Sequence, residues 1–553
     1  MRRRTARTLA LGMVGLLIQP TWAFSGGPQG PPSQGPKPAT PIQHVVVIFQ
    51  ENISFDHYFA TYPFATNPGN EPPFFPAPGT PTVNGLTPAL LTANPNFLNG
   101  ANNVTTTTPP VNSIAANPFR LDRSQASTAD QDHDYTPEQM AFDSGLMDLF
   151  PLSVGTAGPP PGAPPAAAET QALTMGYYDG NTVTAFWNYA QFFAMNDNSY
   201  DTNFGPSTPG ALNLISGQTN GAINNIGGTG SVVDDGFGGL TVVSDSDPIG
   251  DKCSTSSEQF QMSGPNIGEA LTAANVTWGF FEGGFDLTIT NSNGTTGCAR
   301  STTSTVTNTK KADYIPHHQP FQYYAATANP MHTRPTSVAT IGHNGDAANH
   351  QYDTNDFFKA VAANNFPAVS FLKAPGFQDG HAGYSDPLDE QTFVVNTINF
   401  LEQQPQWKST LVIIAYDDSD GWYDHQMSPI MNQSTTSMDA LTGPGACGNG
   451  ASALPGVATG TTHAQGRCGY GPRLPFLVIS PYAKQNFVDH TLLDQTSIIH
   501  FVEDNWLGGQ RLGQGSFDAI SGSINNMLNF KNNPFFGNVL FLDPDTGEDI
   551  FNY

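Results

Sequence analysis

The chain contains an unbroken apolar run of strand length, His44-Val-Val-Val-Ile-Phe-Gln50, which Glu51 and Asn52 follow directly. A run without polar alternation is typical of a central strand in a parallel sheet, because both faces of such a strand are covered. Four further runs of this kind predict strands of the same sheet: 276–281, 368–372, 411–416 and 476–480.

Amphipathic segments with the period of an α-helix lie between these runs. The apolar residues of 389–404 share one helical face, and Pro405 is expected to end that helix. A second helix is expected at 494–506, with Asp494 as a candidate N-cap. Strands that alternate with helices predict an α/β fold with a parallel sheet.

The composition excludes several classes of protein. Hydrophobic residues make up 38% of the 553 residues and aromatic residues 11%, which excludes a chain that is disordered throughout. The net charge of −26 excludes nucleic-acid binding through a broad basic surface and disfavours an anionic membrane. An anionic substrate would need a local positive charge on such a chain, for which a bound cation is the obvious candidate.

Glycine and proline are frequent, with 56 and 46 residues, and indicate long irregular loops on a folded scaffold. Three segments rich in Pro, Gly, Asn and Thr are predicted to be insertions that lie over one end of the sheet: 61–116, 153–168 and 218–257. We expect a single large domain, 42–553, that carries these insertions.

The N-terminus has the features of a secretory signal peptide at 1–23. Four arginines precede an apolar stretch, and Thr21-Trp-Ala23 fits a cleavage site. The apolar stretch is too short to span a bilayer, although an uncleaved anchor is the alternative. We predict a secreted or periplasmic protein, with a loose match to twin-arginine export, a flexible segment at 24–41 and no other membrane span.

Four cysteines, an even number, are typical of disulfides in an exported protein. None lies in a C-x-x-C pair, so a zinc site built from thiolates is not expected. Of the three possible pairings we expect Cys253–Cys298 and Cys447–Cys468, because both pairs bracket loops rich in Gly, Ser and Thr. The alternative is four buried free thiols.

Acidic and amide side chains follow two of the predicted strands. Glu51 and Asn52 end the first run, and Asp417 and Asp418 end the run at 411–416. Ligands bind at the carboxyl ends of strands in an open parallel sheet, and hard oxygen ligands suit a divalent cation. The alternative is that these residues simply open surface loops.

Ser207 lies on a Gly/Pro turn directly before a predicted helix. The free backbone N–H groups at the start of such a helix can bind a phosphate group. The alternative is that Ser207 or Thr208 only caps the helix. Histidines that could bind a metal or hold a phosphoryl oxygen lie in short polar motifs, although a lone histidine such as His57 or His425 is more often structural. The motif histidines are His133, His317, His318 and His381.

These motifs, taken in order, resemble the bacterial phosphoesterase family of the alkaline phosphatase superfamily, which contains phospholipases C and acid phosphatases. The resemblance runs from about His44 to Trp506. It implies a large mixed, mostly parallel sheet flanked by helices. It rests on Gln50-Glu-Asn-Ile-Ser-Phe-Asp-His-Tyr-Phe59, Asp132-His-Asp134, Gly145-Leu-Met-Asp148, Met175-Gly-Tyr-Tyr-Asp179, Gly205-Pro-Ser-Thr-Pro209, Asp379-Gly-His381, Tyr416-Asp-Asp418, Tyr423-Asp-His425 and Gly471-Pro-Arg-Leu-Pro-Phe-Leu-Val-Ile-Ser-Pro481.

The resemblance also implies roles for single residues. One divalent metal ion, of unknown identity, would be bound by Glu51, Asn52, Asp417 and Asp418 together with the nucleophile Ser207. The histidines around the phosphoryl group would be His133, His381 and His318, with His317 as the alternative to His318. The sequence reads Asp-Asp-Ser-Asp where many relatives have Asp-Glu-His-Gly, so Asp420 is a candidate additional acid, as is Asp424.

We expect an acid phosphatase that hydrolyses small phosphate monoesters through a phosphoserine intermediate. A serine nucleophile and a chain that ends at Tyr553 resemble that branch of the family. The alternative is a phospholipase C that acts on phospholipid head groups, for which Pro72-Pro-Phe-Phe-Pro76 offers an apolar lip. A binding protein on a retired hydrolase scaffold would lack a ligand or the nucleophile, and a sulfatase would need a C-x-P-x-R motif; neither feature is seen.

Overall fold

The computed structural model describes residues 35–107, 110–111, 113–156, 170–228, 230–448, 458–459, 462–463, 465–531 and 538–551. The expected signal peptide and most of the expected flexible segment at 24–41 lie outside these residues, as does most of the insertion at 153–168. The last residues of the flexible segment are described, and the Ala39 N–H donates to the carbonyl of Asn505 at 2.8 Å.

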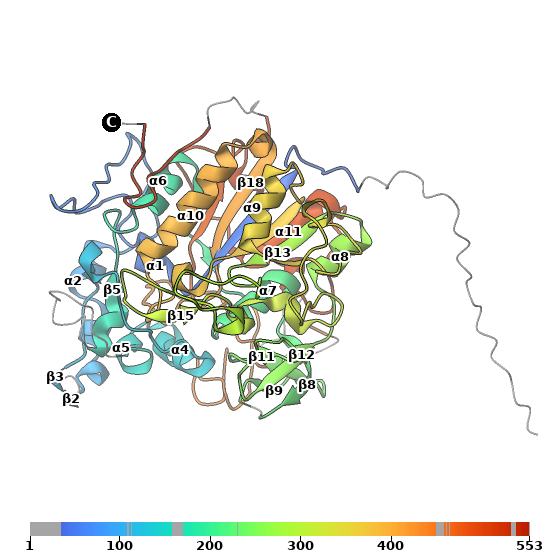
Figure 1. The fold of residues 1–553 in the computed structure, drawn as a ribbon. Helices are drawn as coiled ribbons and strands as arrows, with labels where there is room; N and C mark the ends of the chain where they lie inside the picture. Colours follow the sequence, from blue (N-terminus) through green and yellow to red (C-terminus); the bar gives the residue numbers. More distant parts are fainter. Residues whose placement is uncertain are drawn as a thin grey trace, which may run out of the picture. The chain divides into compact units, whose positions relative to one another are not determined.

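Among the described residues, an eight-stranded sheet forms the centre of the fold and contains all five predicted strands (Figure 1). All of its strands except β21 run in one direction, which confirms a mostly parallel sheet in an α/β fold. The strand order is β16 (Gln351–Asp353), β13 (Trp278–Glu282), β17 (Val369–Lys373), β1 (His44–Gln50), β18 (Thr410–Tyr416), β21 (Phe476–Ile479), β6 (Ala194–Asn196) and β22 (Phe487–Asp489).

The direction of β21 corrects the sequence analysis. The run at 476–480 was expected to be a parallel strand, but β21 is antiparallel to both β18 and β6. All four of its residues are buried. A strand that is covered on both faces is apolar in either direction, so its sequence does not encode its orientation.

The register of the central strands brings their carboxyl ends to one edge of the sheet. Ile48 of β1 pairs with Leu372 of β17, and Gln50 pairs with Tyr416 of β18. Every residue of β18 is buried, and in β1 only His44 is partly exposed. Residues that follow β1, β17 and β18 therefore start from the same level.

Helices cover the sheet. In α10 (Pro387–Glu402) the Asp386 side chain caps the first turn by accepting from the N–H groups of Leu388 and Asp389. α9 (Thr354–Ala362) lies beside α10 in Figure 1, and Phe358 and Phe400 join the two, with ring centroids 5.1 Å apart. The contacts of α7 (Ser207–Ser216) include α8 (Ile267–Ala273) and α11 (Ser497–Trp506).

Asp494 was expected to be the N-cap of α11, but it is not. That helix begins at Ser497 after the N-cap Thr496, and Asp494 ends the short strand β23 (Leu493–Asp494). The Asp494 carboxylate accepts from the backbone N–H of Thr496 at 2.6 Å. Asp494 therefore stabilises the turn that leads into α11, although it is not the N-cap itself.

The insertion at 218–257 is more regular than expected. Four strands within it join β12, which follows it, in a second sheet, which has five strands among the described residues in the order β11-β12-β8-β10-β9 (Figure 1). Short strands rich in Asn and Gly lack the apolar runs that marked the central sheet. Their bounds are Asn220–Ile226 for β8, Val232–Asp234 for β9, Leu240–Val242 for β10, Asp247–Pro248 for β11 and Gln259–Met262 for β12.

Both expected disulfides are formed. Cys253 pairs with Cys298 and Cys447 with Cys468, with Cα–Cα distances of 5.2 and 5.9 Å. The alternative of four free thiols is therefore wrong. Among the described residues, no helix is both long and apolar enough to cross a bilayer.

The apolar segment at 72–76 is divided between core and surface. The Phe74 ring is 1% exposed and packs against Trp187, with ring centroids 5.1 Å apart. The neighbouring Phe75 is 70% exposed. Only part of the expected apolar lip therefore faces solvent.

Candidate active site

The four oxygen-bearing residues predicted at the two strand ends come together. Glu51 and Asn52 follow β1, Asp417 and Asp418 follow β18, and all four side chains are buried. We call them the oxygen cluster. Asp417 connects the two strands, because its Oδ1 accepts from the N–H of Asn52 at 3.1 Å and of Asp418 at 2.9 Å.

Asn52 turns the chain sharply at the end of β1. Its φ of 54° lies in the left-handed region, which Asn adopts more readily than most residues. This turn directs the chain away from the sheet directly after Glu51. A residue with a branched β-carbon at this position would strain the backbone.

The Ser207 side chain also contacts the oxygen cluster. It is the first residue of α7, Pro206 is the N-cap, and the structure shows no side-chain cap. The interpretation of Ser207 as an N-cap is therefore wrong. Its Oγ lies 3.0 Å from Glu51 Oε2 and 3.1 Å from Asp418 Oδ2.

Gly205 makes the turn before α7. Its φ of 125° is one that other residues rarely adopt, and a β-carbon there would lie 3.3 Å from the carbonyl oxygen of Val243. The Gly205 N–H donates to Glu138 Oε2 at 3.1 Å. The turn that presents Ser207 is thus fixed by backbone geometry and by a buried carboxyl group.

The donor set fits a divalent cation. One terminal atom of the Asn52 amide lies 2.8 Å from Glu51 Oε2, 2.9 Å from Asp417 Oδ1 and 3.2 Å from Asp418 Oδ2. If this atom is the amide oxygen, four oxygens converge, and a cation between them would make that arrangement favourable. If it is the amide nitrogen, it donates protons to the same three carboxylates.

Without a cation, the carboxylates of the cluster resist ionisation. Burial, followed by the Glu51 charge, raises the pKa of Asp417 well above its usual value. Burial also raises the pKa of Asp418, and the nearby His133 offsets this only in part. A cation that neutralised this cluster would restore the ionised forms of both residues.

Three of the predicted histidines surround the cluster. His318 Nδ1 lies 3.3 Å from Glu51 Oε1. His381 Nε2 and His133 Nε2 lie 3.2 and 3.4 Å from the other terminal atom of the Asn52 amide, the one that does not face the carboxylates. The rings of His133 and His381 meet edge to face, with centroids 5.6 Å apart.

The three histidines differ in charge. Burial lowers the pKa of His381 to about 3 and that of His318 well below its usual value, so both are neutral at pH 7. Burial alone would also lower the pKa of His133, but Asp418 and Asp420 outweigh it and raise this pKa well above 6.5. Of these three histidines, His133 is thus the one that is protonated on both ring nitrogens and positively charged.

The other candidate residues, Asp420, His317 and Asp424, do not contact the oxygen cluster in the same way. Asp420 is buried beside His133, with Asp420 Oδ1 and His133 Nδ1 3.3 Å apart. His317 faces Asp245 and Asp247 instead of the oxygen cluster, at N–O distances of 3.9 and 3.6 Å. The choice between the two neighbouring histidines therefore favours His318.

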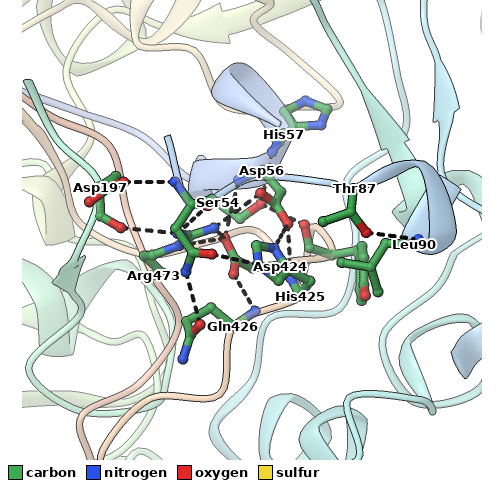
Figure 2. A network of polar contacts seen from close by, with 12 residues as sticks. Ser54, Asp56, His57, Thr87, Leu90, Asp197, Asp424, His425, Gln426 and Arg473 are labelled. Carbon is green, nitrogen blue, oxygen red and sulfur yellow. Dashed lines mark hydrogen bonds and ion pairs between the residues drawn. The ribbon is translucent and has the colours of Figure 1, made fainter. Parts of the chain in front are cut away.

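Asp424 belongs to a second buried network (Figure 2). Arg473, which is fully buried, donates its Nε to Asp424 Oδ2 at 3.0 Å and its Nη2 to Asp56 Oδ1 at 3.1 Å. His425 Nδ1 lies 2.6 Å from Asp56 Oδ2. This network connects α1 (Phe55–Phe59), the loop after β18 and the segment before β21. Asp424 therefore faces Arg473 and not Ser207.

His57 has the structural role that a lone histidine most often has. Its ring stacks on Trp422 with centroids 3.8 Å apart, and its Nδ1 lies 2.8 Å from the carbonyl oxygen of Gly176. Burial lowers its pKa to about 3.

Sequence analysis missed several charged residues of the site. Lys373 ends β17 and contacts the oxygen cluster; the strand-end rule that found Glu51 points to this position too, but it does not show that the lysine side chain is buried. Asp245 accepts from the Thr208 N–H at 2.8 Å but comes from the insertion, where no motif marks it. Glu138 and Asp201 are buried nearby, and burial raises the pKa of Glu138 to about 8.

Known proteins match this chain over most of its length. The profile of the Phosphoesterase family matches residues 42–507. A non-hemolytic phospholipase C of Pseudomonas aeruginosa is 24% identical over 515 residues, which cover 89% of this chain and 58% of that protein. Phospholipase C A of Mycobacterium tuberculosis is 23% identical over 509 residues, which cover 90% of this chain and 80% of that protein.

The match includes the whole oxygen cluster, Ser207 and the three surrounding histidines, all of which lie within 42–507. The chain spans little more than half the length of the Pseudomonas relative. Because the family profile covers most of the chain, this protein belongs to the Phosphoesterase family.

Proposed function

We propose that this protein is a metal-dependent phosphoesterase of the phospholipase C type, which hydrolyses the phosphodiester of phospholipid head groups. The observation that carries the proposal is the position of the Ser207 hydroxyl, 3.0 and 3.1 Å from oxygens of Glu51 and Asp418 and 3.3 Å from a terminal atom of the Asn52 amide. A hydroxyl held among carboxylates at the amino end of a helix is suited to attack a phosphorus atom.

The chemistry follows from the positions of the side chains. Ser207 Oγ bonds to phosphorus as the bond to the departing alcohol breaks, and the hydroxyl proton passes to a neighbouring carboxylate. His133 gives its proton to the departing alcohol. Water then cleaves the phosphoserine: its oxygen bonds to phosphorus as the bond to Ser207 Oγ breaks, one of its protons returns to Ser207, and the proton held by the carboxylate restores His133. A divalent cation held by the oxygen cluster would lower the pKa of the Ser207 hydroxyl and offset charge on the phosphoryl oxygens.

The names of the relatives support a phospholipase C ahead of an acid phosphatase, which is the reverse of the order expected from the sequence. Sequence analysis put phosphate monoesters first, whereas the Pseudomonas and Mycobacterium relatives described above, which align over most of this chain, are named phospholipases C. Exposed apolar side chains in the first third of the chain also suit a lipid substrate. They are Phe64, Phe75, Phe97, Leu98, Val104, Met140, Leu146 and Leu152.

Acid phosphatase activity is the second candidate function. The three histidines and Ser207 would serve a monoester equally well, because a monoester presents the same phosphoryl group to them. In either case the two disulfides support an exported protein, secreted or periplasmic.

A substrate panel tests the proposal. Phosphatidylcholine in mixed micelles, nitrophenyl phosphorylcholine and nitrophenyl phosphate are each compared from pH 5 to 8, with and without a chelator, and Ser207→Ala gives the background. We expect the highest kcat/KM on a diester and loss of activity after chelation. Faster hydrolysis of the monoester across this range would instead favour the acid phosphatase.

A further inference from the structure

A lysine lies inside the oxygen cluster. Lys373 is the last residue of β17, and its side chain is 1% exposed. Its Nζ forms an ion pair with Glu51 Oε1 and another with Asp417 Oδ2, the latter at 3.0 Å. A buried ammonium group is costly unless carboxylates compensate it, and these two carboxylates belong to the proposed metal site.

The position of Lys373 follows from the strand register. β17 pairs with β1 on one side and with β13 on the other, so Lys373 ends the strand beside the one that carries Glu51. The Ser207 hydroxyl lies near Oε2 of Glu51, whereas Lys373 Nζ contacts Oε1 of the same residue. The ammonium group and the nucleophile therefore contact different oxygens of the same carboxylate.

The charges of the cluster leave room for one divalent cation. Glu51, Asp417 and Asp418 carry three negative charges when ionised, and Lys373 supplies one positive charge. Two negative charges remain, which is the charge that one divalent ion neutralises. The protonated His133 and the buried Asp420 beside it, 3.3 Å apart, balance each other and leave this count unchanged. The three carboxylates and Lys373 are all buried, so solvent compensates little of any imbalance.

We propose that Lys373 is a built-in second cation of the phosphoesterase site, which sets the charge of the oxygen cluster for one divalent ion and for an anionic substrate. Lys373 is a positioning residue, because its contacts are with Glu51 and Asp417. The inference rests on the proposed function and specifies how an acidic protein admits a phosphate ester.

This role predicts opposite effects on two ligands. Lys373 repels a divalent cation bound to the same carboxylates, so removal of its charge should tighten cation binding. The same removal leaves one uncompensated negative charge near the substrate, which should weaken phosphate binding. General damage to the site would weaken both, so the signs of the two changes distinguish the explanations.

The test uses Lys373→Met in the full chain, with Mn²⁺ and inorganic phosphate as probes. Both dissociation constants are measured by calorimetry, Mn²⁺ on chelated protein and phosphate on protein saturated with Mn²⁺. We expect the Kd for Mn²⁺ to fall about tenfold or more and the Kd for phosphate to rise by a similar factor. The stoichiometry in the parent protein should be one Mn²⁺ per chain.

Two matched variants serve as controls. Lys373→Arg keeps the charge, so both constants should stay within roughly threefold of those of the parent protein. Lys484→Met removes a lysine that lies over the Phe487 ring, outside the oxygen cluster, and should change neither constant by more than roughly threefold. A loss of both affinities in Lys373→Met, or no change in either, would overturn the inference.

Folding of the variant is part of the test. Because Lys373→Met is expected to bind Mn²⁺ more tightly, saturating Mn²⁺ should restore any stability that the variant loses. A variant that stays unfolded in Mn²⁺ counts against the inference. Failure of the parent protein to bind either probe would instead contradict the proposed function, so the two failures are distinguishable.

Discussion

Ser207 is placed where the helix that carries it does not use its hydroxyl group. Pro206 is the N-cap of α7, and the Ser207 Oγ lies near Glu51 and Asp418 instead of the backbone N–H groups of the first turn. Removing that hydroxyl should therefore cost the helix little, whereas the proposed chemistry depends on it.

We predict that Ser207→Ala lowers kcat/KM by roughly 10³-fold or more, since the covalent step is lost, while circular dichroism and thermal melting stay unchanged. Thr208→Val, at the next position of α7, is the matched control and should keep most of the turnover. Near-normal activity in Ser207→Ala would transfer the nucleophilic role to another residue or exclude covalent catalysis.

The retained proton on His133 leads to a second prediction, which concerns the leaving group. An alkyl alcohol needs a proton as it departs, whereas nitrophenolate leaves readily without one. His133→Asn should therefore slow an alkyl ester roughly 10²-fold more than a nitrophenyl ester. His317→Asn, which lies beside Asp245 and Asp247, should slow both esters by the same factor. Equal slowing in His133→Asn would remove His133 as the acid.

The residues that sequence analysis found and missed share a physical explanation. Glu51 and Asp418 stand out because they are acidic residues directly after long apolar runs. Lys373 ends such a run too, but a lysine there also fits a strand that reaches solvent, and only the structure shows its side chain to be 1% exposed. Asp245 gives no local signal, because its contact with Thr208 depends on how the insertion folds back.

At the scale of elements, the sequence shows which segments form strands and helices better than how they are oriented. The apolar runs predicted the five central strands to within about two residues. The direction of β21 depends on the path of the chain between β18 and β21, which no local pattern contains. The second sheet was missed because strands such as β8 carry Gly and Asn and are half exposed.

The end of α10 shows how one carboxyl group connects an element to a distant segment. Glu402 is 6% exposed, and its Oε1 accepts from the Leu540 N–H at 2.9 Å. Asn399, one turn earlier, donates to the Leu542 carbonyl at 2.8 Å. The described segment 538–551 is thus held against α10 partly by a carboxyl group that burial keeps protonated.

Glu402 gives a prediction about the pH dependence of stability. Burial raises its pKa to about 8, so the folded protein favours the protonated form, and stability falls as pH rises from about 4.5 to 8. Glu402→Gln removes this dependence and should be more stable than the parent at pH 8, by roughly a few kcal/mol at most. Denaturant unfolding at pH 5 and 8 measures it.

The matched control for Glu402 is Glu548→Gln, on the same C-terminal segment but partly exposed. It should leave the slope of stability against pH unchanged. If Glu402→Gln showed the same slope as the parent protein, the carboxyl group would already be ionised in the folded state.

At the scale of the whole molecule, the oxygen cluster is where distant parts of the chain meet. β1, β17 and β18 contribute from the centre of the sheet, α7 contributes Ser207, and His133, His318 and His381 contact the cluster from three further segments. A cation bound there would stabilise contacts between segments separated by hundreds of residues. Its removal should therefore weaken the whole fold and not only the activity.

This coupling gives a prediction that depends on pH. In the absence of a cation, the pKa values of Asp417 and Asp418 are raised, so the chelated protein keeps its stability at low pH and loses it as pH rises. With a cation, both groups are ionised in the complex, and protons compete less for them at higher pH. The gain in melting temperature from saturating Mn²⁺ should therefore increase from pH 5 to pH 8.

Asp418→Asn separates this effect from nonspecific binding of cations to an acidic protein. The variant keeps the shape of the cluster and nearly all of the net charge of −26, but it lacks one ionised ligand. Mn²⁺ should raise its melting temperature less than in the parent, and the rise should depend less on pH. A shift that is equal in variant and parent, or that does not change with pH, would mean that Mn²⁺ acts elsewhere on the surface. The proposed metal site would then be wrong, however well its oxygens converge.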